Sequence, residues 1–225
     1  DLLADALLAS IRTPLGESAG GASLLDVAPA DRLAELDFEL PLAGGARDRL
    51  HKATVADLAA LLRTHLPVDD PLAPYPDMLA TEGLGGRSLG GYLVGSIDAV
   101  LRIHHPASPG PAHLVVDYKT NVVPTDGEPL TAWHYQPDRL ASVMMAAHYP
   151  LQALLYTVAL HRYLRWRQHG YQPEVHLGGV LYLFLRGLVG PAAVDGHGRP
   201  CGAFSWQPPT ALVLEASDLL AGGAR

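Results

Sequence analysis

Hydrophobic and polar positions follow helix-like spacing in some parts of the 225-residue chain and strand-like spacing in others. Apolar residues that recur every three or four positions predict helices over 1–11, 54–64, 131–147, 151–168 and 212–220. Alternating or continuous short apolar runs predict strands over 32–42, 92–103, 113–119, 176–186 and 204–206. Stretches rich in Pro and Gly predict loops over 67–76, 104–111 and 191–200. This mixture of elements predicts an α/β fold.

Two of the predicted strands are joined by a short loop and are expected to form a hairpin. They are Tyr92–Ile103 and His113–Lys119. Side chains alternate between the two faces of a strand, so Asp117 and Lys119 project from the same side. If the strands pair, Asp98 lies beside Asp117. The hairpin then brings two carboxylates and one ammonium group together.

Such a group of charges suits a metal-dependent reaction on a phosphate. Hard divalent cations such as Mg²⁺ prefer carboxylate and carbonyl oxygens. A bound cation lowers the pKa of its water and offsets charge on a phosphoryl group, and a lysine orients the attacking water. An exposed Asp117–Lys119 ion pair, which contributes about 0–1 kcal/mol, is the alternative. The occurrence of Gly95-x-x-Asp98 on the preceding strand favours the metal site.

Four stretches, taken in order, resemble the RecB-type nuclease domain of the PD-(D/E)xK superfamily. That domain is the C-terminal domain of the exonuclease V β subunit. The stretches are Gly95–Asp98, Asp117–Asn121, the helix Leu151–Leu164 and the strand Gly178–Gly187. The likeness extends from about residue 2 to residue 206 and so covers nearly the whole chain.

The resemblance implies a fold and an activity. The implied fold is a restriction-endonuclease-like PD-(D/E)xK core, with a central mixed β-sheet flanked by helices, in a single domain over residues 1–225. The implied activity is Mg²⁺-dependent hydrolysis of DNA phosphodiester bonds, as an exonuclease or endonuclease. The protein would then be part of a RecBCD-type helicase–nuclease that acts in double-strand break repair and recombination.

The same resemblance implies a role for each of several residues in this chain. Asp98, Asp117 and the backbone carbonyl of Tyr118 are implied as metal ligands, and Lys119 as the catalytic lysine. Gln152 and Tyr156, which share a helix face at i and i+4, match a supporting motif. Mg²⁺ is the implied ion, with Mn²⁺ and Ca²⁺ as alternative occupants.

Two further ligands of the family are less clear in this chain. Glu35 aligns with an acidic residue that the family has on the strand 32–42, and a solvated strand face is the alternative. The family also has a histidine ligand on a helix before that strand, but the helix 1–11 contains no histidine. We expect that ligand upstream of Asp1, in a longer helicase–nuclease chain. His51 and His65 are the alternatives.

Composition excludes some classes and leaves others open. The single cysteine, Cys201, excludes an internal disulfide and a four-cysteine iron–sulfur cluster, and it favours the reducing bacterial cytoplasm. No apolar run reaches the roughly 18–20 residues of a membrane span. The net charge of −7 does not indicate a nucleic-acid binder. It fits either a chain that does not bind DNA or an acidic nuclease site that relies on neighbouring domains for affinity.

Partners and alternatives complete the prediction. The resemblance implies DNA as substrate, single-stranded at the site, with RecC- and RecD-like subunits and a RecA-type recombinase acting through the parent protein. A non-catalytic DNA-binding or recombinase-docking module is the alternative, but all three residues of the Asp98, Asp117 and Lys119 set are present. A solute-binding or oxidoreductase α/β domain would need a Gly-rich strand-to-helix turn, which is absent. Arg162, Arg165 and Arg167 fit either DNA contact or a favourable helix C-terminus.

Overall fold

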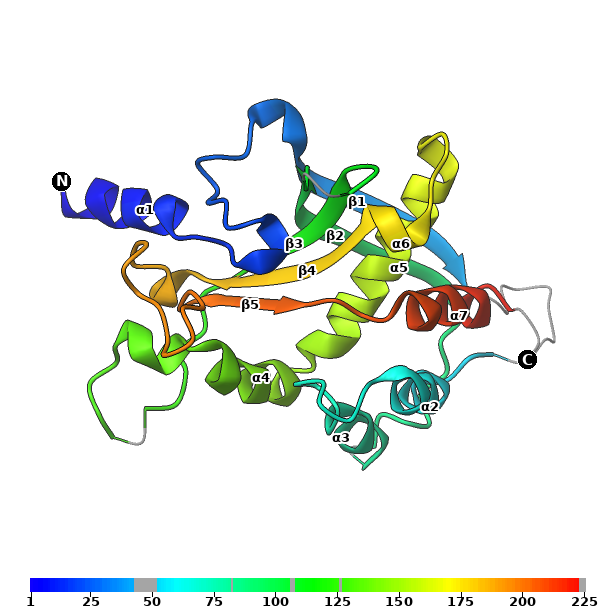
Figure 1. Ribbon diagram of the computed structural model, residues 1–225. Coiled ribbons are helices and arrows are strands. Elements are labelled where there is room, and N and C mark those ends of the chain that lie inside the picture. The colour runs from blue at the N-terminus through cyan, green and yellow to red at the C-terminus, as the bar shows by residue number, and fades with distance from the viewer. Residues whose placement is uncertain (43–51, 82, 106–107, 126, 223–225) are drawn as a thin grey trace. The chain divides into compact units, whose positions relative to one another are not determined.

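The computed structural model describes residues 1–42, 52–81, 83–105, 108–125 and 127–222, and its elements are shown in Figure 1. Five strands form one sheet in the order β1-β2-β3-β4-β5. They are β1 (Arg32–Leu42), β2 (Gly91–Ile103), β3 (Ala112–Lys119), β4 (Leu177–Phe184) and β5 (Ala203–Trp206). β3 is parallel to β4, whereas β2 pairs with β3 and β4 with β5 in antiparallel orientation. The predicted mixed sheet of an α/β fold is therefore confirmed.

The described residues form seven α-helices and four short 3₁₀ turns. The helices are α1 (Leu2–Arg12), α2 (Val55–His65), α3 (Tyr75–Thr81), α4 (Pro137–Ala146), α5 (Tyr149–Arg167), α6 (Pro173–His176) and α7 (Thr210–Leu220). The turns are η1 (Glu17–Ala19), η2 (Pro29–Asp31), η3 (Ala132–Tyr135) and η4 (Leu185–Gly187). The predicted helices are confirmed, except that the stretch 131–147 consists of the turn η3 followed by α4, which begins at Pro137.

One predicted loop boundary was wrong. The stretch 67–76 was expected to be loop throughout, yet α3 begins at Tyr75 and has Pro76 in its first turn. Proline is tolerated there because the first N–H groups of a helix have no intrahelical partner. α5 begins at Tyr149 with Pro150 in the same place.

The chain forms two compact units, each made from three separate stretches. Unit 1 comprises 1–36, 97–143 and 175–207, and unit 2 comprises 37–96, 144–174 and 208–225. β1 and β2 each pass from one unit into the other. A single nuclease domain over residues 1–225 stays a prediction.

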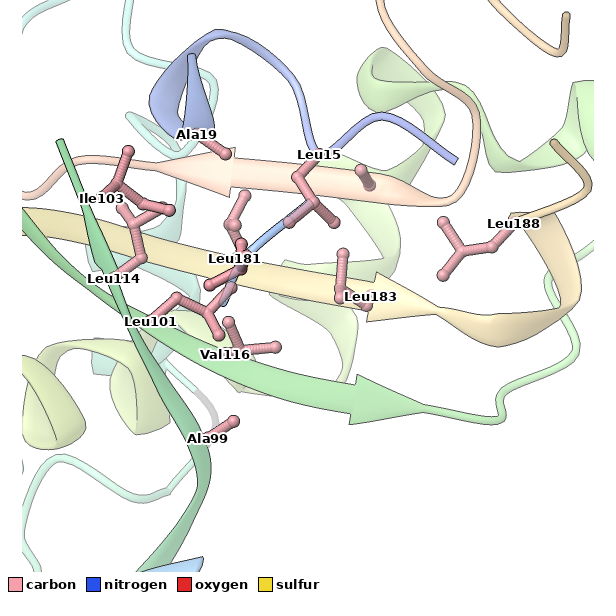
Figure 2. Packing of buried hydrophobic residues seen from close by; sticks show 12 residues of the cluster. Leu15, Ala19, Ala99, Leu101, Ile103, Leu114, Val116, Leu181, Leu183 and Leu188 are labelled. Atoms are coloured by element: carbon pink, nitrogen blue, oxygen red, sulfur yellow. The ribbon is translucent and has the colours of Figure 1, made fainter. Parts of the chain in front are cut away.

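The core of unit 1 covers one face of the sheet (Figure 2). Alternate residues of β2, β3 and β4 point into it, as the register that pairs Leu101 with Leu114 requires. Leu15 and Ala19, from the segment after α1, pack against these strands. The cluster consists of Leu15, Ala19, Val27, Ala99, Leu101, Ile103, Leu114, Val116, Leu181, Leu183, Leu188 and Ala203.

α1 belongs to unit 1 but buries none of its residues. Its apolar side remains exposed, including Leu2, which is 87% exposed, and Leu7. Contacts at its C-terminal end hold it in place: Ser10 Oγ donates to the Leu188 carbonyl at 2.9 Å, and the Gly190 N–H donates to Thr13 Oγ1 at 2.9 Å. An amphipathic pattern thus predicted the helix correctly, although its apolar side is not buried.

Unit 2 contains a helical cluster in which α2 contacts α3 and α7, and α5 contacts α7. α2 begins at a capping box, because Thr54 Oγ1 accepts from the Asp57 N–H and Asp57 Oδ2 accepts from the Thr54 N–H. Arg162 of α5 donates to the Ser217 carbonyl at 2.6 Å and to Ser217 Oγ at 3.0 Å. Arg162 therefore joins α5 to α7.

The helices differ in length and in apolar content. Among the described residues, no single helix is both long and apolar enough to cross a membrane. α4 and α5 reach that length and composition only when they are taken together across the bend between them.

Candidate active site

The antiparallel ladder between β2 and β3 ends beside the predicted site. It pairs Ile103 with Ala112 at one end and Ala99 with Val116 at the other. One further step in this register places Asp98 opposite Asp117, which confirms the predicted hairpin. Where the ladder ends, the Tyr118 N–H donates to Asp98 Oδ2 at 2.9 Å instead of to a backbone carbonyl. The end of this ladder therefore fixes the Asp98 carboxylate.

Asp117 and Lys119 lie on the same face of β3, as their spacing predicts. Lys119 Nζ is 2.6 Å from Asp117 Oδ2, and the two side chains are 13% and 4% exposed. Lys119 Nζ also lies 5.2 Å from the centre of the ring of Tyr182 on β4, which is paired with Asp117 in the parallel ladder. The alternative of an exposed surface ion pair is wrong because both side chains are largely buried.

The segment after Lys119 is held by hydrogen bonds to its carbonyl groups. Arg186 Nε donates to the Thr120 carbonyl at 3.0 Å. The Tyr135 hydroxyl donates to the Asn121 carbonyl at 2.9 Å. These contacts position the end of β3, and with it Lys119, from two other parts of unit 1.

Burial raises the pKa of Asp117 above its usual value. The ammonium group of Lys119 opposes this shift, whereas the negative charge of Asp98 adds to it. Within the described part of the chain, Asp117 Oδ2 has the Lys119 ammonium group beside it and no other hydrogen-bond donor. Further positive charge at this point would stabilise both carboxylates, so the residues present fit a hard divalent cation.

The structure brings together only part of the predicted ligand set. Among the described residues, no three of the His, Cys, Asp and Glu side chains are close enough to hold a metal ion. Glu35 is exposed and has a φ of 52°, which interrupts the alternation of β1. His65 Nε2 lies 3.2 Å from Glu215 Oε1 in unit 2, and His51 falls outside the described residues.

A cavity of about 290 Å³ opens beside Asp98, and sequence patterns gave no indication of it. The side chains around it are mostly apolar. Burial raises the pKa of Tyr118, and the charge of Asp98 acts in the same direction. The lining residues are Ile11, Leu24, Leu25, Arg32, Ala34, Asp98, Ala99, Leu101 and Tyr118.

Unit 2 contains the other predicted pair, Gln152 and Tyr156. Gln152 Nε2 donates to the Tyr156 hydroxyl at 2.9 Å, which confirms that they share a face of α5. The edge of one ring faces the other between Phe38 and Tyr156, with ring centres 5.9 Å apart at 82°. Because these residues belong to unit 2, their position relative to Asp98 and Asp117 stays a prediction.

The structure gives a reason for the glycine of the Gly95-x-x-Asp98 pattern. A Cβ atom at Gly95 would lie 2.7 Å from Cζ of Phe38, closer than side chains tolerate. Gly95 therefore leaves room for the Phe38 ring, which in turn contacts Tyr156. The alternating pattern of residues 32–42 predicted the strand but did not reveal this role.

We expect Gly95→Ala to destabilise the protein by about 1–3 kcal/mol, because the added methyl group displaces the Phe38 ring. Urea denaturation measures the effect. The double variant Gly95→Ala/Phe38→Leu is the control, since a smaller side chain removes the obstacle and should recover part of the loss. If Gly95→Ala costs as much in a Phe38→Leu background as it does alone, the ring is not the obstacle.

The comparisons with known proteins agree with the geometry. No family model matches the chain. It is 54% identical over 222 residues to the RecBCD enzyme subunit RecB of Mycobacterium tuberculosis, an alignment that covers 98% of this chain and 19% of that protein. The RecB subunit of Mycolicibacterium smegmatis is 51% identical over 97% of this chain and 20% of that protein. The RecB subunit of Escherichia coli is 32% identical over 98% of this chain and 16% of that protein.

The chain thus spans less than a quarter of the length of the relatives that it matches. Its alignment with them nevertheless includes nearly all of its own residues, as the ordered motifs predict. The chain is therefore a homologue of one part of the RecB subunit and belongs to the RecB-type sequences.

Proposed function

We propose that this chain is the nuclease domain of a RecB-type protein and hydrolyses phosphodiester bonds of DNA. The observation that carries the proposal is the buried Asp117–Lys119 ion pair, with Asp98 fixed next to it at the end of the β2–β3 ladder. Burying the Asp117–Lys119 pair beside the half-buried Asp98 carboxylate costs free energy, and such clusters occur mainly where chemistry needs them. Homology to RecB along almost the whole chain supports the same activity.

The carboxylates of Asp98 and Asp117, with the backbone carbonyl of Tyr118, are the groups that would hold the divalent cation, which we propose is Mg²⁺. Mn²⁺ and Ca²⁺ have the same preference for oxygen ligands. When bound, the cation supplies a lowered pKa for water and offsets the charge of the phosphate group. Glu35 stays a proposed further ligand from β1.

Lys119 acts on the water and on the phosphate. Its ammonium group, held by Asp117, orients the attacking water for in-line approach to phosphorus. As the new bond between water oxygen and phosphorus forms, negative charge grows on the phosphoryl oxygens, and Lys119 stabilises it. The bond to the leaving sugar oxygen then breaks, and that oxygen accepts a proton. Gln152 and Tyr156 are proposed to support the bound phosphate.

The biological setting is part of the proposal. Because relatives are RecBCD enzyme subunits, we propose that the chain acts within a helicase–nuclease of the bacterial cytoplasm, in double-strand break repair and recombination. RecC- and RecD-like subunits and a RecA-type recombinase are the proposed partners. DNA would reach the site as a single strand.

The proposal is tested with end-labelled single-stranded DNA and the full natural polypeptide. Cleavage is expected with Mg²⁺ and not with EDTA, and Lys119→Ala is expected to lower the rate by about 10²–10⁴-fold. Lys119→Arg is the matched variant, because it keeps the charge and alters the geometry.

The opposite outcome is equally clear. If DNA remains intact with every metal ion, and the protein gives a cooperative thermal transition, the chain is not a nuclease. Binding of DNA under the same conditions would then support the non-catalytic DNA-binding module.

A further inference from the structure

An exposed tryptophan marks the C-terminal end of α5 in unit 2. Trp166 is 76% exposed, although burial of an aromatic side chain is strongly favourable. Within the described parts of α5 and α7, no other large hydrophobic side chain is exposed. Trp166 therefore adds little to the core, and it is an isolated aromatic group rather than part of an apolar patch.

The surroundings of Trp166 are cationic. Arg167 Cζ lies 5.0 Å from the centre of the Trp166 ring, and Arg165 and His169 are exposed nearby in sequence. No Asp or Glu occurs between Asp138 and Glu174, in a chain whose net charge is −7. We call Arg165, Trp166, Arg167 and His169 the Trp166 surface.

Contacts within unit 2 explain some of the charged residues near Trp166, but they do not explain the exposed tryptophan. The Arg162 guanidinium is used in contacts with Ser217 and the Pro41 carbonyl, so it is not part of this surface. Two acids lie near this end of α5: Glu174 interacts electrostatically with Tyr171, and Asp218 interacts electrostatically with His161. Cations at a helix C-terminus interact favourably with the helix dipole, which explains arginines there but not an exposed tryptophan beside them.

We propose that the Trp166 surface binds single-stranded DNA, with a base stacked on Trp166 and adjacent phosphates on Arg165 and Arg167. Stacking on an aromatic ring next to cationic groups is how proteins bind single strands without reading sequence. The core of a protein–protein interface would place further apolar side chains around the tryptophan, and none is exposed in the described parts of α5 and α7. The inference rests on the proposed function for its class of ligand, and it adds a binding surface made of residues other than those proposed for cleavage.

The test measures binding separately from cleavage. The 225-residue chain is titrated into labelled oligo(dT) in EDTA, so that no hydrolysis occurs, and affinity is followed by the fluorescence anisotropy of the label. Trp166→Ala is expected to weaken binding about tenfold, and Trp166→Phe to retain most of it. Removing Arg165 and Arg167 together is expected to reduce the salt dependence, by about 0.7 in the log–log slope for each lost phosphate contact.

Trp133→Ala is the matched control, because Trp133 is also exposed but belongs to unit 1 and has Glu128 and Asp138 near it in sequence. It is expected to leave affinity unchanged. Equal affinity for Trp166→Ala and the unsubstituted chain overturns the inference, as does an equal loss of affinity in Trp133→Ala. Neither result depends on cleavage, so a failed nuclease assay and a failed binding assay remain distinguishable.

Discussion

Replacing Asp117 with asparagine is expected to abolish DNA cleavage and to leave the protein at least as stable as before near neutral pH. Asparagine keeps the shape of the side chain but lacks the charge that a divalent cation requires. Changes to groups that only support metal ligands lower activity or affinity about 10–100-fold, so loss of a ligand should exceed about 100-fold. The measurement is the rate of single-strand cleavage in Mg²⁺.

The expected stability of the Asp117→Asn variant follows from the pKa of Asp117, which burial raises above the usual 3.8. Between that value and the raised pKa, the folded protein binds more protons than the unfolded chain, so its stability falls as pH rises through this interval. The uncharged amide of the Asp117→Asn variant would have no such dependence. The thermal stability of this variant relative to the unsubstituted protein should therefore increase as pH rises from about 4 toward neutrality.

Asp69→Asn is the control, since Asp69 is an exposed carboxylate outside the site. It should affect neither cleavage nor the pH dependence of the melting temperature. Cleavage that survives Asp117→Asn would contradict the assigned site. A melting temperature that drops sharply at neutral pH would instead mean that the Lys119 ion pair outweighs the cost of burial.

The largest expected loss of stability comes from Gly202→Ala. Gly202 has a φ of +82°, and a Cβ there would lie 2.6 Å from the backbone carbon of Gly187 and 2.7 Å from the Leu188 nitrogen. These are backbone atoms between β4 and β5. Gly202 is itself held in place, because its N–H donates to the Tyr135 carbonyl and its carbonyl accepts from the Phe184 N–H. Backbone strain and overpacking together should cost about 3 kcal/mol or more.

Gly198→Ala separates the two causes. Gly198 has nearly the same φ, +78°, but nothing within 4 Å of the added methyl group. It should cost only about 1–2 kcal/mol, the strain of a left-handed residue. Thermal unfolding measures the effect in both variants. In a protein of this size, each kcal/mol of lost stability lowers the melting temperature by about 2–4 °C. Equal shifts for the two variants would show that the close approach to Gly187 contributes nothing.

Sequence patterns predicted the elements of this fold well, because each follows a local period. The β2–β3 hairpin and the neighbouring places of Asp98 and Asp117 followed from strand alternation and one short loop. The left-handed conformation of Glu35 did not, since non-glycine residues rarely adopt it. Nor did the Phe38–Gly95 contact, which joins segments that are far apart in the sequence. The cavity beside Asp98 is lined by residues from 11 to 118 and has no local pattern at all.

Exposure was the property that patterns predicted least. The apolar side of α1 has the same spacing as that of a buried helix, yet no residue of α1 is buried in unit 1. Periodicity reports which residues share a face and not what covers that face. The burial of Lys119 was equally invisible, because it depends on the parallel neighbour β4 and the Tyr182 ring.

The division of each unit into three separate stretches has a consequence for synthesis on the ribosome. β3 ends at Lys119, but its parallel neighbour β4 begins only at Leu177, and β5 ends at Trp206. At about 5–20 residues per second, β3 waits several seconds for β4, and the backbone N–H and C=O groups along that edge of β3 are unpaired in the meantime. Asp117 and Lys119 are thus made early, and their burial is complete only after β4 has emerged. The nascent chain therefore has a defined interval in which chaperone binding would matter most.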